Sequence, residues 1–120
     1  MKTLRRLSPV DKATWLATVA ADKKAADILV LDVSHYASIT DYMLLATMES
    51  SVQLRAVAEA MEKEIDHWGG VGLRREGSPR SLWMILDVGS VVVHLMGPEE
   101  RNRYRLEELW GGGQTVVFHL

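Results

Sequence analysis

Two short apolar runs decide the fold class of this chain: ILVLDV at residues 28–33 and YMLLAT at residues 42–47. Both are rich in aliphatic side chains and show little alternation between apolar and polar positions, which is typical of strands buried on both faces of a sheet. The polar loop at 34–40 separates the two runs. The sequence therefore predicts two central strands that other elements must cover.

Helical signals lie on either side of these runs. Ser8 followed by Pro9 predicts the start of a helix that ends before Ile28. A second helix is predicted over residues 50–68, because apolar side chains recur there at three- and four-residue steps and share one face. These side chains are Leu54, Val57, Ala58, Met61, Ile65 and Trp68.

The second half of the chain predicts a β-hairpin. LWMILD at residues 82–87 and VVVHLM at residues 91–96 flank the short stretch VGS, a sequence typical of a tight turn between strands. Residues 71–76 indicate a short edge strand before the hairpin, and residues 77–80 are expected to form a loop.

The C-terminal part predicts one more helix and a tail. Pro98 opens the helix and acidic residues follow it, where the helix dipole favours them; the helix is expected to continue to Trp110, before a run of three glycines. We predict a single domain over residues 1–110, followed by a short, apolar C-terminal tail at 111–120. The fold class is α/β (α+β), with a mixed β-sheet of about five strands flanked by helices.

Composition narrows the classes of function. The 120 residues are 48% apolar and 25% charged, which fits one globular domain, and 14 basic against 16 acidic residues give a net charge of -2. Proteins that coat nucleic acid usually carry a basic excess, so we expect little or no direct nucleic-acid binding. The absence of cysteine excludes disulfides and thiolate zinc sites. Pro9, Asp11 and Lys12 interrupt the apolar core that a signal peptide needs, so we expect a cytoplasmic protein with no membrane contact.

Three aspartates at strand ends suggest one kind of chemistry. Asp32, Asp41 and Asp87 each close or precede a predicted strand, and carboxylates gathered there can bind a divalent ion for nucleotidyl transfer. However, such sites normally hold two carboxylates one residue apart after a Gly-Ser pair, and Gly77-Ser78 leads to Pro79 instead. We therefore favour strand-capping aspartates and keep a metal-dependent nucleotidyltransferase-like enzyme as the alternative function.

Two other groups of side chains offer further interpretations. Four histidines are scattered without metal-ligand spacing, and only His94 lies within an apolar strand, where a core or groove histidine is the usual case. Arg74, Arg75 and Arg80 surround a glycine-containing loop, so they either contact RNA phosphates or keep the loop solvated. We prefer the second interpretation.

Trp83 is a candidate for binding another protein. It begins a strand directly after a polar loop, where a large ring is often only half covered, and aromatic and methionine side chains are the usual anchors of interfaces. The alternative is that Trp83 packs beneath the helix at 50–68.

Several motifs in order resemble one family. They are KAADILVLDV (24–33), SITDY (38–42), AT (46–47), EG (76–77), WMILDVG (83–89), VVVH (91–94), ER (100–101) and YRLEELW (104–110). This set is similar to the ribosomal silencing factor family (RsfS, also called Iojap or YbeB) over about residues 10–110, and the tail at 111–120 lies outside the resemblance. The chain differs from the usual family motifs at Met48-Glu49-Ser50, Ser90, Met96 and Arg103.

The resemblance implies a fold and a function. The fold would be nucleotidyltransferase-like without the catalytic site, and the protein would need no cofactor and no enzymatic activity. It would bind the large ribosomal subunit through ribosomal protein fourteen and sterically block association with the small subunit. Translation would thereby be repressed under nutrient limitation, with a further role in large-subunit biogenesis.

Five residues are expected to form the contact with the ribosomal protein. Trp83 and Met84 would supply apolar contact, Asp41 and Asp87 would meet its basic residues, and His94 would line the same surface. Without a ribosome, the apolar face around Trp83 would be able to pair two copies as a homodimer.

Overall fold

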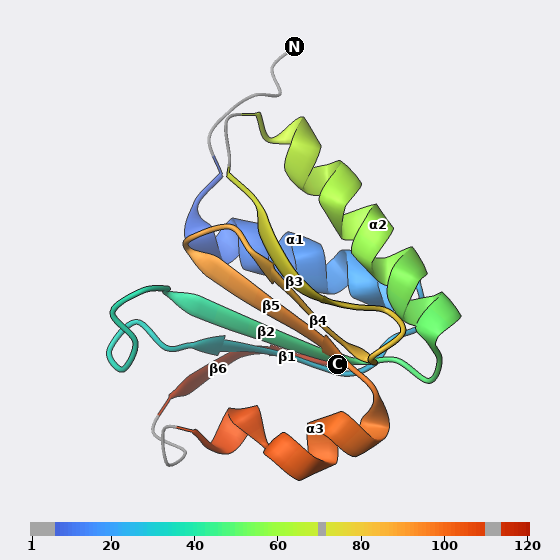
Figure 1. The fold of residues 1–120 in the computed structure, drawn as a ribbon. Helices are drawn as coiled ribbons and strands as arrows, with labels where there is room; N and C mark the ends of the chain where they lie inside the picture. Colours follow the sequence, from blue (N-terminus) through green and yellow to red (C-terminus); the bar gives the residue numbers. More distant parts are fainter. Residues whose placement is uncertain (1–6, 70–71, 110–113) are drawn as a thin grey trace.

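In the part of the chain that the structure describes, six strands form a single mixed sheet (Figure 1). The computed structural model describes residues 7–69, 72–109 and 114–120. The order across the sheet is β3-β4-β5-β2-β1-β6, and β2 and β5 are a parallel pair at its centre, while the other neighbours are antiparallel. The strands are β1 (Ala26–Asp32), β2 (Tyr42–Thr47), β3 (Arg74–Ser78), β4 (Trp83–Asp87), β5 (Val91–Met96) and β6 (Thr115–His119). The predicted mixed sheet flanked by helices is confirmed.

Among the described residues, three α-helices flank this sheet: α1 (Pro9–Asp22), α2 (Ser51–His67) and α3 (Pro98–Tyr104). The hydroxyl of Ser8 accepts a hydrogen bond from the backbone N–H of Asp11 at 3.2 Å, and Ser50 caps α2 in the same way through Gln53 at 3.1 Å. These caps satisfy backbone donors that the first turn of a helix leaves free, so both helices start where the sequence predicts.

The two faces of the sheet carry different cores. On the two-helix face, α1 and α2 cover a large cluster that includes Leu16, Leu44 and Met61, all fully buried. On the opposite face, here called the α3 face, the buried cluster is small. It consists of Leu31, Val33, Met43, Leu45 and Met96, with Leu29, Ala37, Trp83 and Leu106 half-buried around it.

The C-terminal part differs from its prediction. The expected single helix ends at Tyr104 because Arg105 adopts a left-handed conformation (φ 43°), and a short 3-10 turn follows at Leu106–Glu108. The expected end of that helix, Trp110, lies outside the described residues. The expected tail contains strand β6, which pairs with the outer edge of β1 and occupies backbone groups that would otherwise lack partners.

The edge strand β3 also differs from the predicted residues 71–76, of which residue 71 lies outside the described residues. It begins at Arg74 and continues through Gly77 to Ser78, which the prediction had assigned to a loop. Gly77 has φ +80°, and a Cβ atom there would collide with the carbonyl oxygen of Trp83 on β4. Glycine therefore allows the close approach of β3 to the start of β4. Among the described residues, no helix has the length and apolar character needed to cross a membrane.

Candidate protein interaction site

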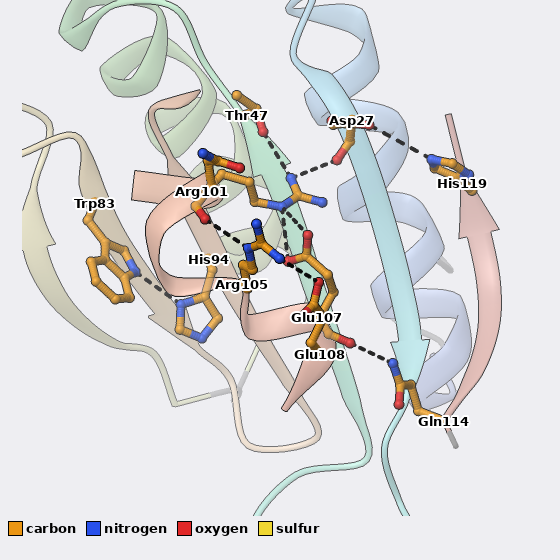
Figure 2. Close-up of polar contacts among 11 residues, drawn as sticks. Asp27, Thr47, Trp83, His94, Arg101, Arg105, Glu107, Glu108, Gln114 and His119 are labelled. Atoms are coloured by element: carbon orange, nitrogen blue, oxygen red, sulfur yellow. Dashed lines mark hydrogen bonds and ion pairs between the residues drawn. The ribbon is translucent and has the colours of Figure 1, made fainter. Parts of the chain in front are cut away.

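Trp83 lies on the α3 face, at the start of β4, and it is half-buried against the small cluster there. It does not pack beneath α2, so that alternative is wrong. Figure 2 shows its indole N–H donating a hydrogen bond to Nδ1 of His94, at 3.1 Å. The indole ring also lies against Tyr104 of α3, with ring centroids 4.6 Å apart and an interplanar angle of 44°. The ring is thus held from two sides while part of it stays accessible.

His94 is the buried member of this group. Its side chain is 9% exposed, and burial lowers the pKa of the imidazole to about 4. The ring is therefore neutral at pH 7, with a bare Nδ1 that accepts from Trp83 and a proton on Nε2. A side chain so deeply covered offers little surface to a partner, so its position beneath the site differs from the lining role expected of it.

Met84 points away from this face. Successive side chains on a strand alternate between faces, and Met84 enters the core of the two-helix face with 8% of its surface exposed. Of the predicted apolar pair, Trp83 alone reaches the accessible surface of the α3 face. We therefore leave Met84 out of the proposed contact surface.

The three strand-end aspartates do lie at one end of the sheet. Asp87 ends β4, Asp32 ends β1 and Asp41 precedes β2, and the register of the strands brings these ends together. Trp83 lies at the other end of β4, about 13 Å away along the strand. The predicted residues therefore form two regions, one aromatic and one acidic.

Two of these carboxylates accept hydrogen bonds from residues two positions further along the chain. Asp32 accepts hydrogen bonds from the backbone N–H and hydroxyl of Ser34, which lower the pKa of its carboxyl group, and Asp87 accepts from the N–H of Gly89 at 2.8 Å. They act as strand caps, as the sequence analysis favoured. Within the described part of the chain, no three histidine or acidic side chains are arranged to hold a metal ion.

Arg101 is a site residue for which the sequence analysis proposed no structural role. It is 9% exposed, and its Nη1 donates to the carbonyl oxygen of Asp27 and to the hydroxyl of Thr47, both at 2.9 Å (Figure 2). Its Nε lies 3.3 Å from a carboxylate oxygen of Glu107. Arg101 thereby connects α3, which carries Tyr104, to the start of β1 and the end of β2.

The predicted basic group does not form one patch. Arg74 and Arg75 are consecutive on β3, so their side chains leave opposite faces of the sheet, and Arg75 pairs with Glu62 of α2 at 2.8 Å. Arg80 instead borders a shallow cleft with Arg55 at the start of α2. The solvated-loop interpretation therefore fits these arginines better than RNA contact.

Comparison with known proteins identifies the family. A family profile described as ribosomal silencing factor during starvation matches residues 7–119. The chain belongs to the ribosomal silencing factor family. The resemblance seen in the motifs is thus confirmed, and the match extends through β6, which the motifs did not include.

Individual relatives support this assignment. A ribosomal silencing factor of Bacillus subtilis is 37% identical over 79% of this chain and 80% of its own length. The chloroplastic protein Iojap of Arabidopsis thaliana is 36% identical over 87% of this chain and 43% of its own length. A mouse protein named for mitochondrial assembly of the ribosomal large subunit is 33% identical over 79% of this chain and 43% of its own length.

Solved structures show the same fold. A crystal structure of a Chromobacterium violaceum protein superimposes with a TM-score of 0.80 at 33% identity, covering 93% of this chain and 92% of the other. A Bacillus halodurans protein gives 0.72 at 31% identity, covering 88% and 95%.

Proposed function

We propose that this protein binds the large ribosomal subunit through ribosomal protein fourteen and sterically blocks association with the small subunit. Translation is thereby repressed when nutrients are limiting. The observation that carries the proposal is the aromatic site on the α3 face, where Trp83 is oriented by His94 and Tyr104 yet remains partly accessible. Family membership supports the same function.

The aromatic and acidic regions of the site contribute different kinds of contact to binding. Trp83 and Tyr104 supply apolar contact, and a ring that is already held in place loses little entropy on binding. Asp41 and Asp87 meet basic residues of the ribosomal protein, which accelerates encounter and fixes orientation. An interface burying roughly 1,200–2,000 Å² in total is enough, because occlusion requires no catalytic residue and no cofactor. A protein with this task acts in the cytoplasm.

Sedimentation with separated ribosomal subunits tests this proposal. We expect the protein to travel with the large subunit and to reduce the yield of joined ribosomes when small subunits are added. Trp83→Ala should weaken binding to the large subunit by about 10- to 100-fold, the range of a buried aromatic anchor. Trp15→Ala is the matched control, because Trp15 lies on α1, is 50% exposed and belongs to the opposite side of the sheet. Failure to sediment with the large subunit would refute the proposal.

We further propose that the same site serves in assembly of the large subunit, a role that the name of the mouse relative suggests. A strain that lacks the protein should then accumulate large-subunit precursors, and the Trp83→Ala protein should not restore mature subunits.

A further inference from the structure

We infer that His94 is a positioning residue: its bare Nδ1 holds the indole of Trp83 in the orientation that binds the partner. The inference rests on the proposed function, and it gives His94 a role other than direct contact. The geometry that carries it is the 3.1 Å hydrogen bond from the indole N–H to Nδ1, between neighbouring strands β4 and β5.

The strand register explains why this pair forms. Trp83 lies directly opposite Met96, and His94 lies opposite Ile85, so Trp83 and His94 are diagonal neighbours on the same face. Diagonal neighbours lie within reach of aromatic side chains. The indole extends across the strand pair toward the imidazole, and the ring centroids are 6.2 Å apart.

The indole N–H of Trp83 can donate a hydrogen bond but cannot accept one. The histidine nitrogen that it meets must therefore be unprotonated. Burial of His94 keeps the imidazole neutral and therefore keeps this acceptor available. Without an acceptor, the part-buried N–H loses its hydrogen-bond partner. Rotation of the ring toward water then becomes favourable, because the N–H can donate to water instead.

Tyr104 alone does not fix this orientation. It lies against one side of the indole with an interplanar angle of 44°, so the contact restricts the ring but does not specify where its N–H points. The hydrogen bond to His94 supplies that direction. If the ring occupies the binding orientation only part of the time, the apparent affinity falls by the same fraction.

Substitutions at His94 in the full chain separate positioning from contact. His94→Phe keeps a ring of similar size but has no acceptor, whereas His94→Gln offers an amide oxygen to the indole N–H. We expect His94→Phe to bind isolated large ribosomal subunits about tenfold more weakly than the parent, and His94→Gln to recover most of that loss. Circular dichroism and thermal unfolding establish that each variant is folded.

A spectroscopic signature reports the hydrogen bond without any ribosome. The indole N–H resonance of Trp83, assigned by its loss in Trp83→Phe, should shift upfield and exchange faster with water in His94→Phe, and should return toward its parent position in His94→Gln. In the Trp83→Phe background, which lacks the donor, His94→Phe should change binding no further.

The outcomes distinguish this inference from the proposed function. Absence of large-subunit binding by the parent protein would overturn the proposed function. Parent-like binding by a folded His94→Phe protein, or an equal further loss in the Trp83→Phe background, would overturn the role of His94 while leaving that function intact. An unshifted indole resonance in His94→Phe would refute the hydrogen bond itself.

Discussion

The two faces of the sheet differ in how deeply their side chains are buried and in the roles of those side chains. On the two-helix face, α1 and α2 cover a large apolar core whose members are almost entirely buried. On the α3 face, a smaller core is bordered by half-buried side chains such as Trp83, and its polar groups form specific hydrogen bonds. Substitutions on the first face should therefore change stability alone, and those on the second should change recognition as well.

The largest effect is expected on the two-helix face. Leu44→Ala removes a fully buried side chain from the central strand β2 and should lower the free energy of unfolding by about 3 to 4 kcal/mol, measured by urea denaturation. The folded fraction of this variant should bind the large subunit as the parent does. A tenfold loss of affinity in the folded variant would break the distinction between the faces.

The next effect is a pH dependence that belongs to the α3 face. The pKa of His94 in the folded chain is about 4, below its ordinary value of 6.5, so the unfolded chain takes up a proton first as the pH falls. The contribution of His94 to the free energy of unfolding is fully present above pH 6.5, and it falls by roughly 3 kcal/mol as the pH is lowered toward 4. Denaturation of the parent and of His94→Gln between pH 7 and pH 4 isolates this contribution. Identical pH profiles of the two proteins would contradict it.

A smaller effect is expected where α3 is attached. Arg101→Met removes hydrogen bonds to Thr47 and to the carbonyl oxygen of Asp27, and should cost about 2 kcal/mol. It should also weaken large-subunit binding, because α3 carries Tyr104 against Trp83. Arg105→Met is the control: this side chain is largely exposed, and its removal should leave both measurements unchanged. Unaltered binding by Arg101→Met would separate α3 from the recognition site.

The smallest effect is expected at the surface pair between β3 and α2. Glu62→Gln removes the partner of Arg75, but both groups reach water and the attraction is screened. The midpoint of thermal unfolding should stay within error of the parent in low and high salt. A clear drop at low salt alone would show that this pair anchors the edge strand to the helix.

Much of this architecture was predictable from the sequence. Helical periodicity placed α2 to within a residue, and aliphatic runs located β1, β2 and both strands of the hairpin, because burial on both faces demands such runs. The direction of a side chain was harder to predict. Trp83 and Met84 are adjacent, so one must enter each face, and only the register against β5 decides which one.

Contacts between distant segments were beyond the reach of sequence patterns. Arg101 meets Thr47 and Asp27 across 54 and 74 positions of the chain, and nothing near it in the sequence marks those partners. β6 escaped prediction for a related reason. Its short apolar segment forms a strand because the edge of β1 is available, and that edge is a property of the folded sheet.

The position of β6 has a consequence for how the chain is synthesised. Its residues follow those of every other described element, yet they pair with β1, whose residues emerge from the ribosome early. Until β6 arrives, the outer edge of β1 carries free backbone donors and acceptors, a state that invites pairing with other nascent chains. Completion of the sheet therefore waits until residues 115–119 have been synthesised.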